Sequence, residues 1–221
     1  MENKYIDLSH TIENGVITYK GLPAPVICDY LSRESSKELY EEGTEFQIGK
    51  IEMVSNTGTY IDTPFHRYSY GKDLSEVELT SFAGLDAIVI RANHLNGKAI
   101  DENTFHGYSL KGKAVLVHSA WDIHWNTDQY YSDAPFLTEA AAKYLLQQEV
   151  ALVGIDSFNI DDTSGKSRPV HSILLKDGIP IVEHLCNLHL LPEEGFTFYA
   201  VPPKIKKMGT FPVRAFAQLK Q

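Results

Sequence analysis

The sequence is poor in cysteine and in long apolar runs. Its two cysteines, Cys28 and Cys186, are too few for a metal site built from several thiolates, and they need not pair, which favours a reducing compartment. No apolar run approaches the ~20 residues that cross a bilayer. The first residues lack the charged-then-apolar pattern of a secretory signal. We therefore expect a soluble, cytoplasmic protein that does not act at a membrane.

Positive charge is also scarce. The chain has 20 lysines and arginines against 29 aspartates and glutamates, a formal net charge of −9. The densest basic cluster is formed by Lys204, Lys206 and Lys207, and it is too small to make a stripe that neutralises phosphates. This balance argues against a nucleic-acid partner and leaves a small-molecule substrate as the expected one.

The apolar sequence that is present suffices for one core. With 221 residues, 43% of them hydrophobic, we expect a single domain over residues 1–221. Apolar, β-branched runs predict buried strands over 85–91, 114–118 and 150–155. The most regular helical pattern covers 138–148. Because the strand at 150–155 is apolar on both faces, the pattern favours a layered α/β fold that is strand-rich with one strong helix.

Side chains that can coordinate a metal ion or transfer a proton are concentrated in residues 55–66. On an extended chain, alternate side chains share one face, and here the even positions hold Asn56, Tyr60, Asp62 and His66. A carboxylate and an imidazole on one face can reach the same ion or the same substrate atom. On spacing alone, a solvated pair in a surface loop is the commoner meaning of such a pattern.

Two other stretches carry polar or aromatic side chains. The run 121–131 contains two tryptophans, two tyrosines and a histidine, which could pack on the scaffold or line a pocket for a flat substrate. The polar run 156–162 begins at the carboxyl end of a predicted strand, where α/β folds commonly place sites. Asp156, Ser157 and Asn159 are candidates there.

Residues 55–66 resemble the signature of the cyclase family, which includes bacterial kynurenine formamidases and isatin hydrolases. The family pattern is His-x-Gly-Thr-His-x-Asp-x-Pro-x-His, and it is matched at Gly58, Thr59, Asp62, Pro64 and His66. Asn56 and Tyr60 stand where the family has its first two histidines. Weaker similarity follows in the family's order, at Asp-Leu-Ser-His (7–10), Trp-Asp-x-x-Trp (121–125), Gly-Ile-Asp (154–156), His171 and Ile-Val-Glu-His-Leu (181–185).

The resemblance implies the swivelling β/β/α fold of that family, hydrolysis of a small amide or ester, and a homodimer or homotetramer. Kynurenine formamidases hold two zinc ions, and Asp62, His171 and Glu183 match the ligands of one of them. The other ion would lose two histidines to Asn56 and Tyr60. Isatin hydrolases hold one metal on that first histidine pair and the aspartate. We therefore expect a site that keeps only one of the two metal positions and holds one zinc or manganese ion.

The resemblance also suggests roles for the remaining side chains. His66 matches the family's proton shuttle and is the predicted acid and base. Tyr60 is predicted to donate a hydrogen bond to a developing oxyanion. The predicted substrate-binding residues are Asn56, Trp121, His124 and Trp125, of which His124 is also a candidate for replacing a missing metal ligand. The histidines at 94, 106 and 118 are given no role.

Two alternatives stay open. Asparagine is a poor zinc ligand and neutral tyrosine a rare one, so the pocket could work without metal, with Asp62 orienting His66 as a base. The chain could also be a binding protein that keeps the fold and a ligand without turnover. A chelator separates the three: it inactivates a metal-dependent hydrolase, leaves a metal-free enzyme active, and is irrelevant to a protein that ligand only stabilises.

Overall fold

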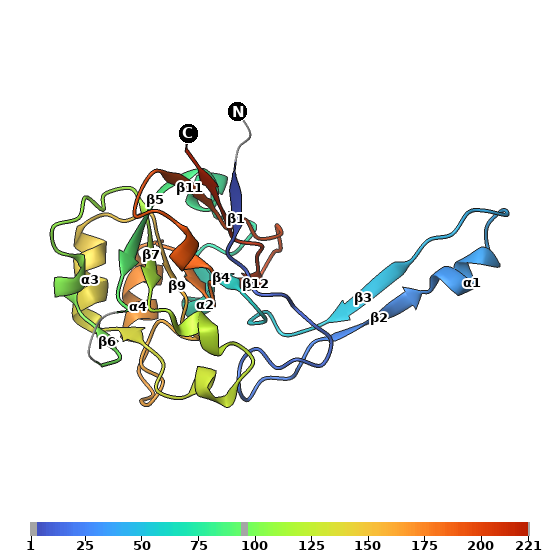
Figure 1. The fold of residues 1–221 in the computed structure, drawn as a ribbon, viewed down its shortest axis with the longest axis horizontal. Helices are drawn as coiled ribbons and strands as arrows, with labels where there is room; N and C mark the ends of the chain where they lie inside the picture. Colours follow the sequence, from blue (N-terminus) through green and yellow to red (C-terminus); the bar gives the residue numbers. More distant parts are fainter. Residues whose placement is uncertain (1–3, 94–96, 221) are drawn as a thin grey trace.

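A computed structural model describes residues 4–93 and 97–220 (Figure 1), so His94 lies outside the described residues. Its centre is a mixed nine-stranded sheet in the order β1-β13-β11-β5-β7-β9-β10-β4-β12. The strands are β1 (Tyr5–Asp7), β4 (Tyr60–Asp62), β5 (Leu85–Arg91), β7 (Ala114–His118), β9 (Leu152–Ile155), β10 (Ile181–Glu183), β11 (Phe196–Tyr199), β12 (Thr210–Pro212) and β13 (Phe216–Leu219).

The middle of the sheet is parallel and buried on both faces. β5, β7, β9 and β10 run parallel, and the strands outside them pair antiparallel. Alternation along β7 sends Val115 and Val117 into one hydrophobic cluster and Ala114 and Leu116 into the other. Both faces need apolar side chains, which explains why these strands are continuous apolar runs. The strands predicted at 85–91 and 114–118 are confirmed.

Two helices cover one face of the sheet. α3 (Glu139–Gln147) is the helix expected from the sequence, and the Thr138 hydroxyl accepts a hydrogen bond from the Ala141 N–H at its start. α4 (Pro169–Lys176) packs against α3 and is a second substantial helix that the sequence did not single out. It begins with a proline, which the first turn tolerates because its N–H groups have no partner within the helix.

The remaining elements are short. They are α1 (Arg33–Lys37), α2 (Pro64–Arg67), the 3-10 turns η1 (Leu79–Ser81), η2 (Glu102–Phe105), η3 (Trp121–His124), η4 (Asp128–Tyr131) and η5 (Leu188–Leu190), and the strand pairs β2 (Val26–Leu31) with β3 (Ile48–Glu52) and β6 (Ala99–Ile100) with β8 (Phe136–Leu137). No helix in the described ranges is long and apolar enough to cross a membrane.

The last part of the chain forms two strands, β12 and β13, that lie in different parts of the sheet. β12 pairs with β4 at one edge of the sheet, while β13 pairs with β11 and β1 near the other. Pro212, at the end of β12, has no N–H to continue a ladder, and the chain leaves the edge there. The division matters because it places β12 beside the signature stretch.

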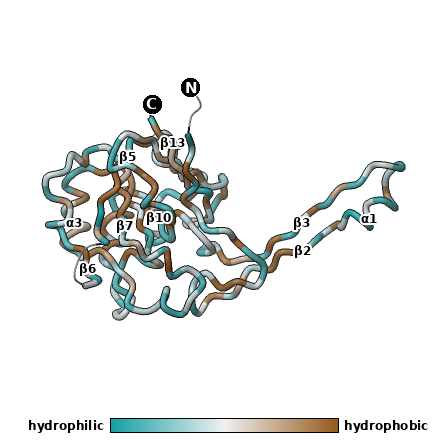
Figure 2. The backbone as a smooth tube through the Cα atoms, viewed as in Figure 1, coloured by the Kyte–Doolittle hydropathy of each residue, from teal (hydrophilic) through white to brown (hydrophobic). Residues whose placement is uncertain are grey.

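β2, β3 and α1 form an arm that projects from the body (Figure 1). Ile27 and Ile51 are paired across the two strands and are both exposed. Val26 points to the opposite face of the ribbon and is exposed as well. Figure 2 shows apolar stretches along both strands. β3, which precedes the stretch 55–66, therefore runs along the arm and not through the core.

Candidate functional site

The signature stretch contains a strand and a helical turn. β4 holds Tyr60 and Asp62, both buried, and α2 begins two residues later at Pro64. In the sheet, β4 lies between β10 and β12. The ladders place Tyr60 opposite Glu183 and Asp62 opposite Thr210. Strand pairing therefore gathers side chains that are far apart in the sequence around Asp62.

A glycine lets the edge strand come close to α2. A Cβ added at Gly209 would lie 2.2 Å from the backbone nitrogen of His66, far inside van der Waals contact. The Gly209 carbonyl accepts hydrogen bonds from both the backbone N–H and the hydroxyl of Thr63. This close approach holds the start of α2 against β12 and brings His66 next to Thr210.

Thr210 links His66 to Asp62. Its hydroxyl donates to Oδ1 of Asp62 and lies 2.7 Å from Nδ1 of His66. A threonine hydroxyl can donate only one hydrogen bond, and here it donates that bond to the Asp62 carboxylate. Nδ1 of His66 must then be the donor to the Thr210 oxygen. The geometry thus assigns the proton to Nδ1 and leaves a lone pair on Nε2 of His66, the exposed member of the group.

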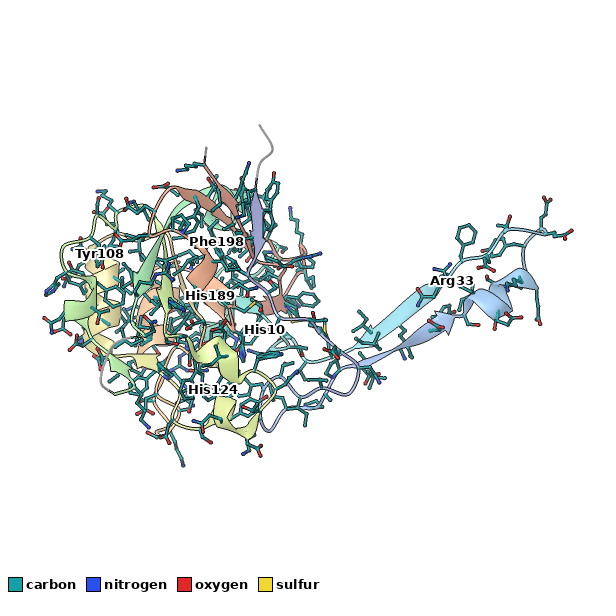
Figure 3. All side chains as sticks on the ribbon, viewed as in Figure 1. His10, Arg33, Tyr108, His124, His189 and Phe198 are labelled. Carbon is teal, nitrogen blue, oxygen red and sulfur yellow. The ribbon has the colours of Figure 1, made fainter. Side chains whose placement is uncertain are left out.

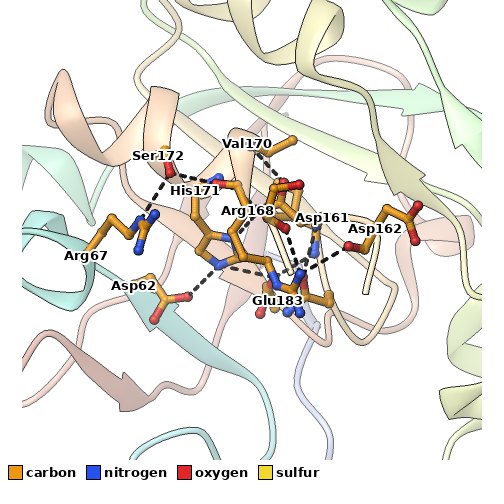
Figure 4. A network of polar contacts seen from close by, with 12 residues as sticks. Asp62, Arg67, Asp161, Asp162, Arg168, Val170, His171, Ser172 and Glu183 are labelled. Carbon is orange, nitrogen blue, oxygen red and sulfur yellow. Dashed lines mark hydrogen bonds and ion pairs between the residues drawn. The ribbon is translucent and has the colours of Figure 1, made fainter. Parts of the chain in front are cut away.

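His171 reaches the same carboxylate from α4. Asp161 accepts hydrogen bonds from the backbone N–H groups of Val170 and His171 and lies 2.6 Å from Nδ1 of the His171 ring. Nε2 of that ring lies 3.5 Å from Oδ2 of Asp62 and 3.6 Å from Oε1 of Glu183 (Figure 4). One aspartate therefore caps the helix and orients the ring toward two other carboxylates.

Glu183 is held by neutral donors. The Tyr60 hydroxyl donates to Oε2 at 2.5 Å, and the Ile160 backbone N–H donates to Oε1 at 2.6 Å. Burial raises the pKa of Glu183 to about 7. Burial, followed by the nearby Glu183 charge, raises the pKa of Tyr60 well above its usual value, so the phenol stays neutral. The single proton of Tyr60, predicted to serve an oxyanion, is committed to Glu183 in this structure.

The buried charges around His171 are predominantly negative. Burial alone would lower its pKa, but the hydrogen bond to Asp161 and the nearby Asp62 and Glu183 carboxylates outweigh burial and raise the pKa to about 10. For Asp62, burial raises the pKa, while the His171 and His66 interactions more than compensate and lower it. Three carboxylates thus surround one imidazole, which is an environment that favours a cation.

These side chains fit a divalent metal ion. In the part of the chain that the structure describes, Asp62, His66 and His171 offer ligand atoms that all lie within 4.8 Å of one another. Oδ2 of Asp62 is buried without a hydrogen-bond partner among the described residues, as expected of an atom that faces an ion. Oxygen and imidazole ligands suit zinc or manganese, and Asp161 orients His171 as outer carboxylates commonly orient metal-binding histidines.

The predicted ligand set and this group differ in one member. The sequence indicates Asp62, His171 and Glu183, whereas the compact group contains His66 in place of Glu183. Glu183 lies alongside and can still offer an oxygen to an ion near His171. Whether an ion uses Glu183 or His66 decides which of the two remains for proton transfer.

A cavity of about 330 Å³ opens beside the group. Three of the four even-numbered candidates, Asn56, Tyr60 and His66, line it, as expected from their spacing. The other lining residues are Tyr19, Leu22, Arg67, Asn159, Arg168, His171 and Glu183. A volume of this size suits a small organic substrate.

The aromatic candidates lie elsewhere. The Trp121 indole N–H donates to the Tyr130 carbonyl, and the His124 ring packs against Trp121. Trp125 stacks on His10 with ring centroids 3.8 Å apart. None of the three lines the cavity, and Figure 3 shows His124 and His10 on the body of the molecule. Their role in substrate binding stays a prediction, while their contacts match packing on the scaffold.

The sequence missed Thr210, Asp161 and the two cavity-lining arginines. Asp161 belongs to the polar run 156–162, so its region was indicated although the residue was not. Of the candidates named there, Asn159 lines the cavity, whereas Asp156 accepts hydrogen bonds from Ser119 and Ala120. Thr210 had no local signal, because its role arises only from pairing with β4.

Fold and site together define a mixed α/β protein with a buried carboxylate and histidine group that suits a metal ion. The family model described as "Cyclase" matches residues 6–162, which is more than half of the chain. The chain therefore belongs to the cyclase family, and the resemblance seen in the sequence is confirmed.

Individual relatives agree with this assignment. The kynurenine formamidase of Geobacillus thermodenitrificans is 28% identical over 218 residues, covering 97% of each chain. Isatin hydrolase A from Labrenzia aggregata, bound to benzyl benzoate, superposes with a TM-score of 0.84 at 21% identity, over 99% of this chain and 94% of that one. A "predicted metal-dependent hydrolase" from Bacillus stearothermophilus gives 0.73 at 26% identity, over 99% of each. The mixed α/β fold is thus shared, while the swivelling β/β/α description and the domain count stay predictions.

We expect the purified chain to bind about one zinc or manganese ion after soaking, because Asp62 and His171 supply ligands with an unpartnered oxygen between them. Elemental analysis of protein prepared without a metal-affinity column measures this. Asp62→Asn and His171→Ala should lose the ion, whereas Asp86→Asn, on the exposed side of β5, should retain it. An unchanged ion content in both site variants would place the metal elsewhere.

Proposed function

We propose that the protein hydrolyses a small amide or ester, in the manner of an arylformamidase acting on N-formylkynurenine-type substrates. The observation that carries this proposal is the chain of contacts from His66 through Thr210 to Asp62, whose other oxygen faces His171 beside a cavity. This arrangement combines a proton carrier and a metal-capable group at one place. The relatives named as kynurenine formamidase and isatin hydrolase support the same reaction class.

His66 acts as the acid and base in this proposal. Its Nε2 lone pair takes a proton from the water that adds to the substrate carbonyl carbon. The same proton is then given to the leaving nitrogen or oxygen as its bond to that carbon breaks. The products are an acid and an amine or alcohol, and His66 returns to its starting form. Thr210 and Asp62 keep the imidazole oriented throughout.

Asp62 and His171, with Glu183 as the third ligand, would hold the metal, so that His66 stays available for proton transfer. Such an ion polarises a carbonyl group and lowers the pKa of water toward about 7. Tyr60 positions Glu183 by its hydrogen bond. Asn56 lines the cavity and offers its amide to the substrate.

The combined test uses a chelator and a histidine variant. We expect chelation to abolish hydrolysis of formanilide-type amides and added zinc or manganese to restore it. His66→Ala should lower kcat by about 10²–10⁴, while His106→Ala, on the surface, should not. Activity that ignores the chelator would favour the metal-free alternative. Stabilisation by ligand without product would favour the binding protein.

Thr210 is a positioning residue, and its hydroxyl can be removed at nearly constant volume. Thr210→Val should lower kcat about 10–100-fold with little change in KM, because His66 loses the partner that fixes its orientation. Thr210→Ser keeps the hydroxyl and should recover most of kcat. If Ser and Val behaved alike, the hydroxyl would have no part in the reaction.

We also propose that the arm joins two copies of this chain into a homo-oligomer. A two-stranded ribbon with both faces exposed is at best marginally stable by itself, and Ile51 and Tyr30 are 58% and 78% exposed. Residues 33–45 near its tip contain five acidic and two basic residues. Lys204, Lys206 and Lys207 on the body offer complementary charge for the tip of a second copy.

Ile51→Glu should shift the protein from an oligomer to a single 24.8 kDa chain, because it places a charge on the apolar face of the arm. Light scattering coupled to size exclusion measures the mass. Lys50→Gln, on the opposite face of the same strand, should leave the oligomer intact. A wild-type protein that is monomeric at every concentration would rule out association through the arm.

A further inference from the structure

Two arginines line the candidate cavity without a carboxylate partner. Arg67 is the last residue of α2, and Arg168 immediately precedes α4. Among the described residues, the only arginine in an ion pair is Arg214, which contacts Asp7. The chain has five arginines and a net charge of −9. Two guanidinium groups that form no ion pair among the described residues therefore meet at one cavity.

Uncharged groups hold both side chains in place. Nε of Arg67 donates to the Ser172 hydroxyl at 3.1 Å, and that hydroxyl donates to the Arg168 carbonyl at 2.7 Å (Figure 4). Nη1 of Arg168 donates to three backbone carbonyls in the loop 162–167, at 2.7–3.2 Å. Because both side chains are fixed in this way, little rotamer freedom is lost when a ligand binds.

These contacts leave most of the donors unused. Within residues 4–93 and 97–220, neither terminal nitrogen of Arg67 has a hydrogen-bond partner, and Nε and Nη2 of Arg168 have none. Holding the loop thus accounts for only one nitrogen of Arg168. A guanidinium group stays protonated at any working pH and matches a carboxylate with parallel N–H donors.

On the basis of the proposed function, we propose that Arg67 and Arg168 bind a carboxylate that the substrate carries beside the bond that is cleaved, such as the amino-acid carboxylate of an N-formylkynurenine-type substrate. A divalent ion would be balanced by Asp62 and Glu183. Neither guanidinium group forms an ion pair among the described residues, so both can pair with an anion that enters the cavity. Asn56 and Asn159 line the same cavity as uncharged hydrogen-bonding groups.

The test compares formanilide with its ortho-, meta- and para-carboxylates, which share the ring and the scissile formamide and differ by one charge. At least one carboxylate isomer should exceed formanilide in kcat/KM by about tenfold, chiefly through a lower KM, since a hydrogen bond to a charged group is worth about that factor or more. Binding is measured separately as the thermal shift given by benzoate and by its neutral counterpart benzamide.

Arg67→Met and Arg168→Met should each bring the ratio of the two kcat/KM values toward one and remove the benzoate shift. Arg67→Lys keeps the charge and should retain part of the preference. Arg214→Met removes a positive charge that pairs with Asp7 and does not line the cavity, and it should leave the ratio as in the wild type. Arg168→Met removes contacts that hold the loop 162–167 and could disturb it. Arg67→Met does not touch that loop, so it tests the anion site independently.

Three results would overturn the inference. The first is a preference for the carboxylate substrate that persists in both Met variants. The second is an equal loss of kcat on neutral and anionic substrates, which would make the arginines oxyanion stabilisers. The third is an equal thermal shift with benzoate and with benzamide. If no amide or ester were hydrolysed, the proposed function would fail. A benzoate shift that the Met variants abolish would still establish the anion site in that case.

Discussion

The buried carboxylate of Asp62 is the constraint on which the rest of the site depends. A charge removed from water is tolerated only when neighbours compensate it, and removing one partner of a buried pair costs about 3–5 kcal/mol. Oδ1 accepts a hydrogen bond from the Thr210 hydroxyl, while Oδ2 faces His171 and has no hydrogen-bond donor among the described residues. That asymmetry makes one oxygen structural and leaves the other for a ligand.

The sheet supplies this asymmetry. β4 lies between β10 and β12, so that one neighbouring strand brings Glu183 and the other brings Thr210. In the proposed function the two sides do different work, with Glu183 and His171 as metal ligands beside Asp62 and with Thr210 and His66 on the side of proton transfer. Tyr60, at a position where the family signature has a histidine, donates its hydroxyl hydrogen bond to Glu183.

The same cavity also shows how charge outside the reacting group can set selectivity. Arg67 and Arg168 flank the metal-capable group from α2 and from the start of α4, and Ser172 connects them. Because α2 and α4 also carry His66 and His171, any change in the packing of these helices would move the binding and reacting groups together. In the proposed mechanism, the packing of these two helices therefore couples substrate binding to proton transfer.

The sequence by itself determined the elements whose signal is local. Apolar, β-branched runs predicted β5 and β7, helical periodicity predicted α3, and the signature match that includes Asp62 and His66 indicated the site. Helix α4 was not predicted, because Asp161, which accepts hydrogen bonds at its start, is nine positions before Val170 and is not part of a local capping pattern.

Only the tertiary structure decided the partners of each functional group. Thr210 is 148 positions from Asp62, and no pattern near either residue encodes their contact. Strand order placed β12 and not β13 beside β4, and Gly209 allowed the approach that brings Thr210 to His66. Tertiary packing also placed the aromatic side chains Trp121, His124 and Trp125 against neighbouring rings and not in the cavity lining. Residue type along the chain specifies the chemistry available, but register between distant strands determines which groups meet.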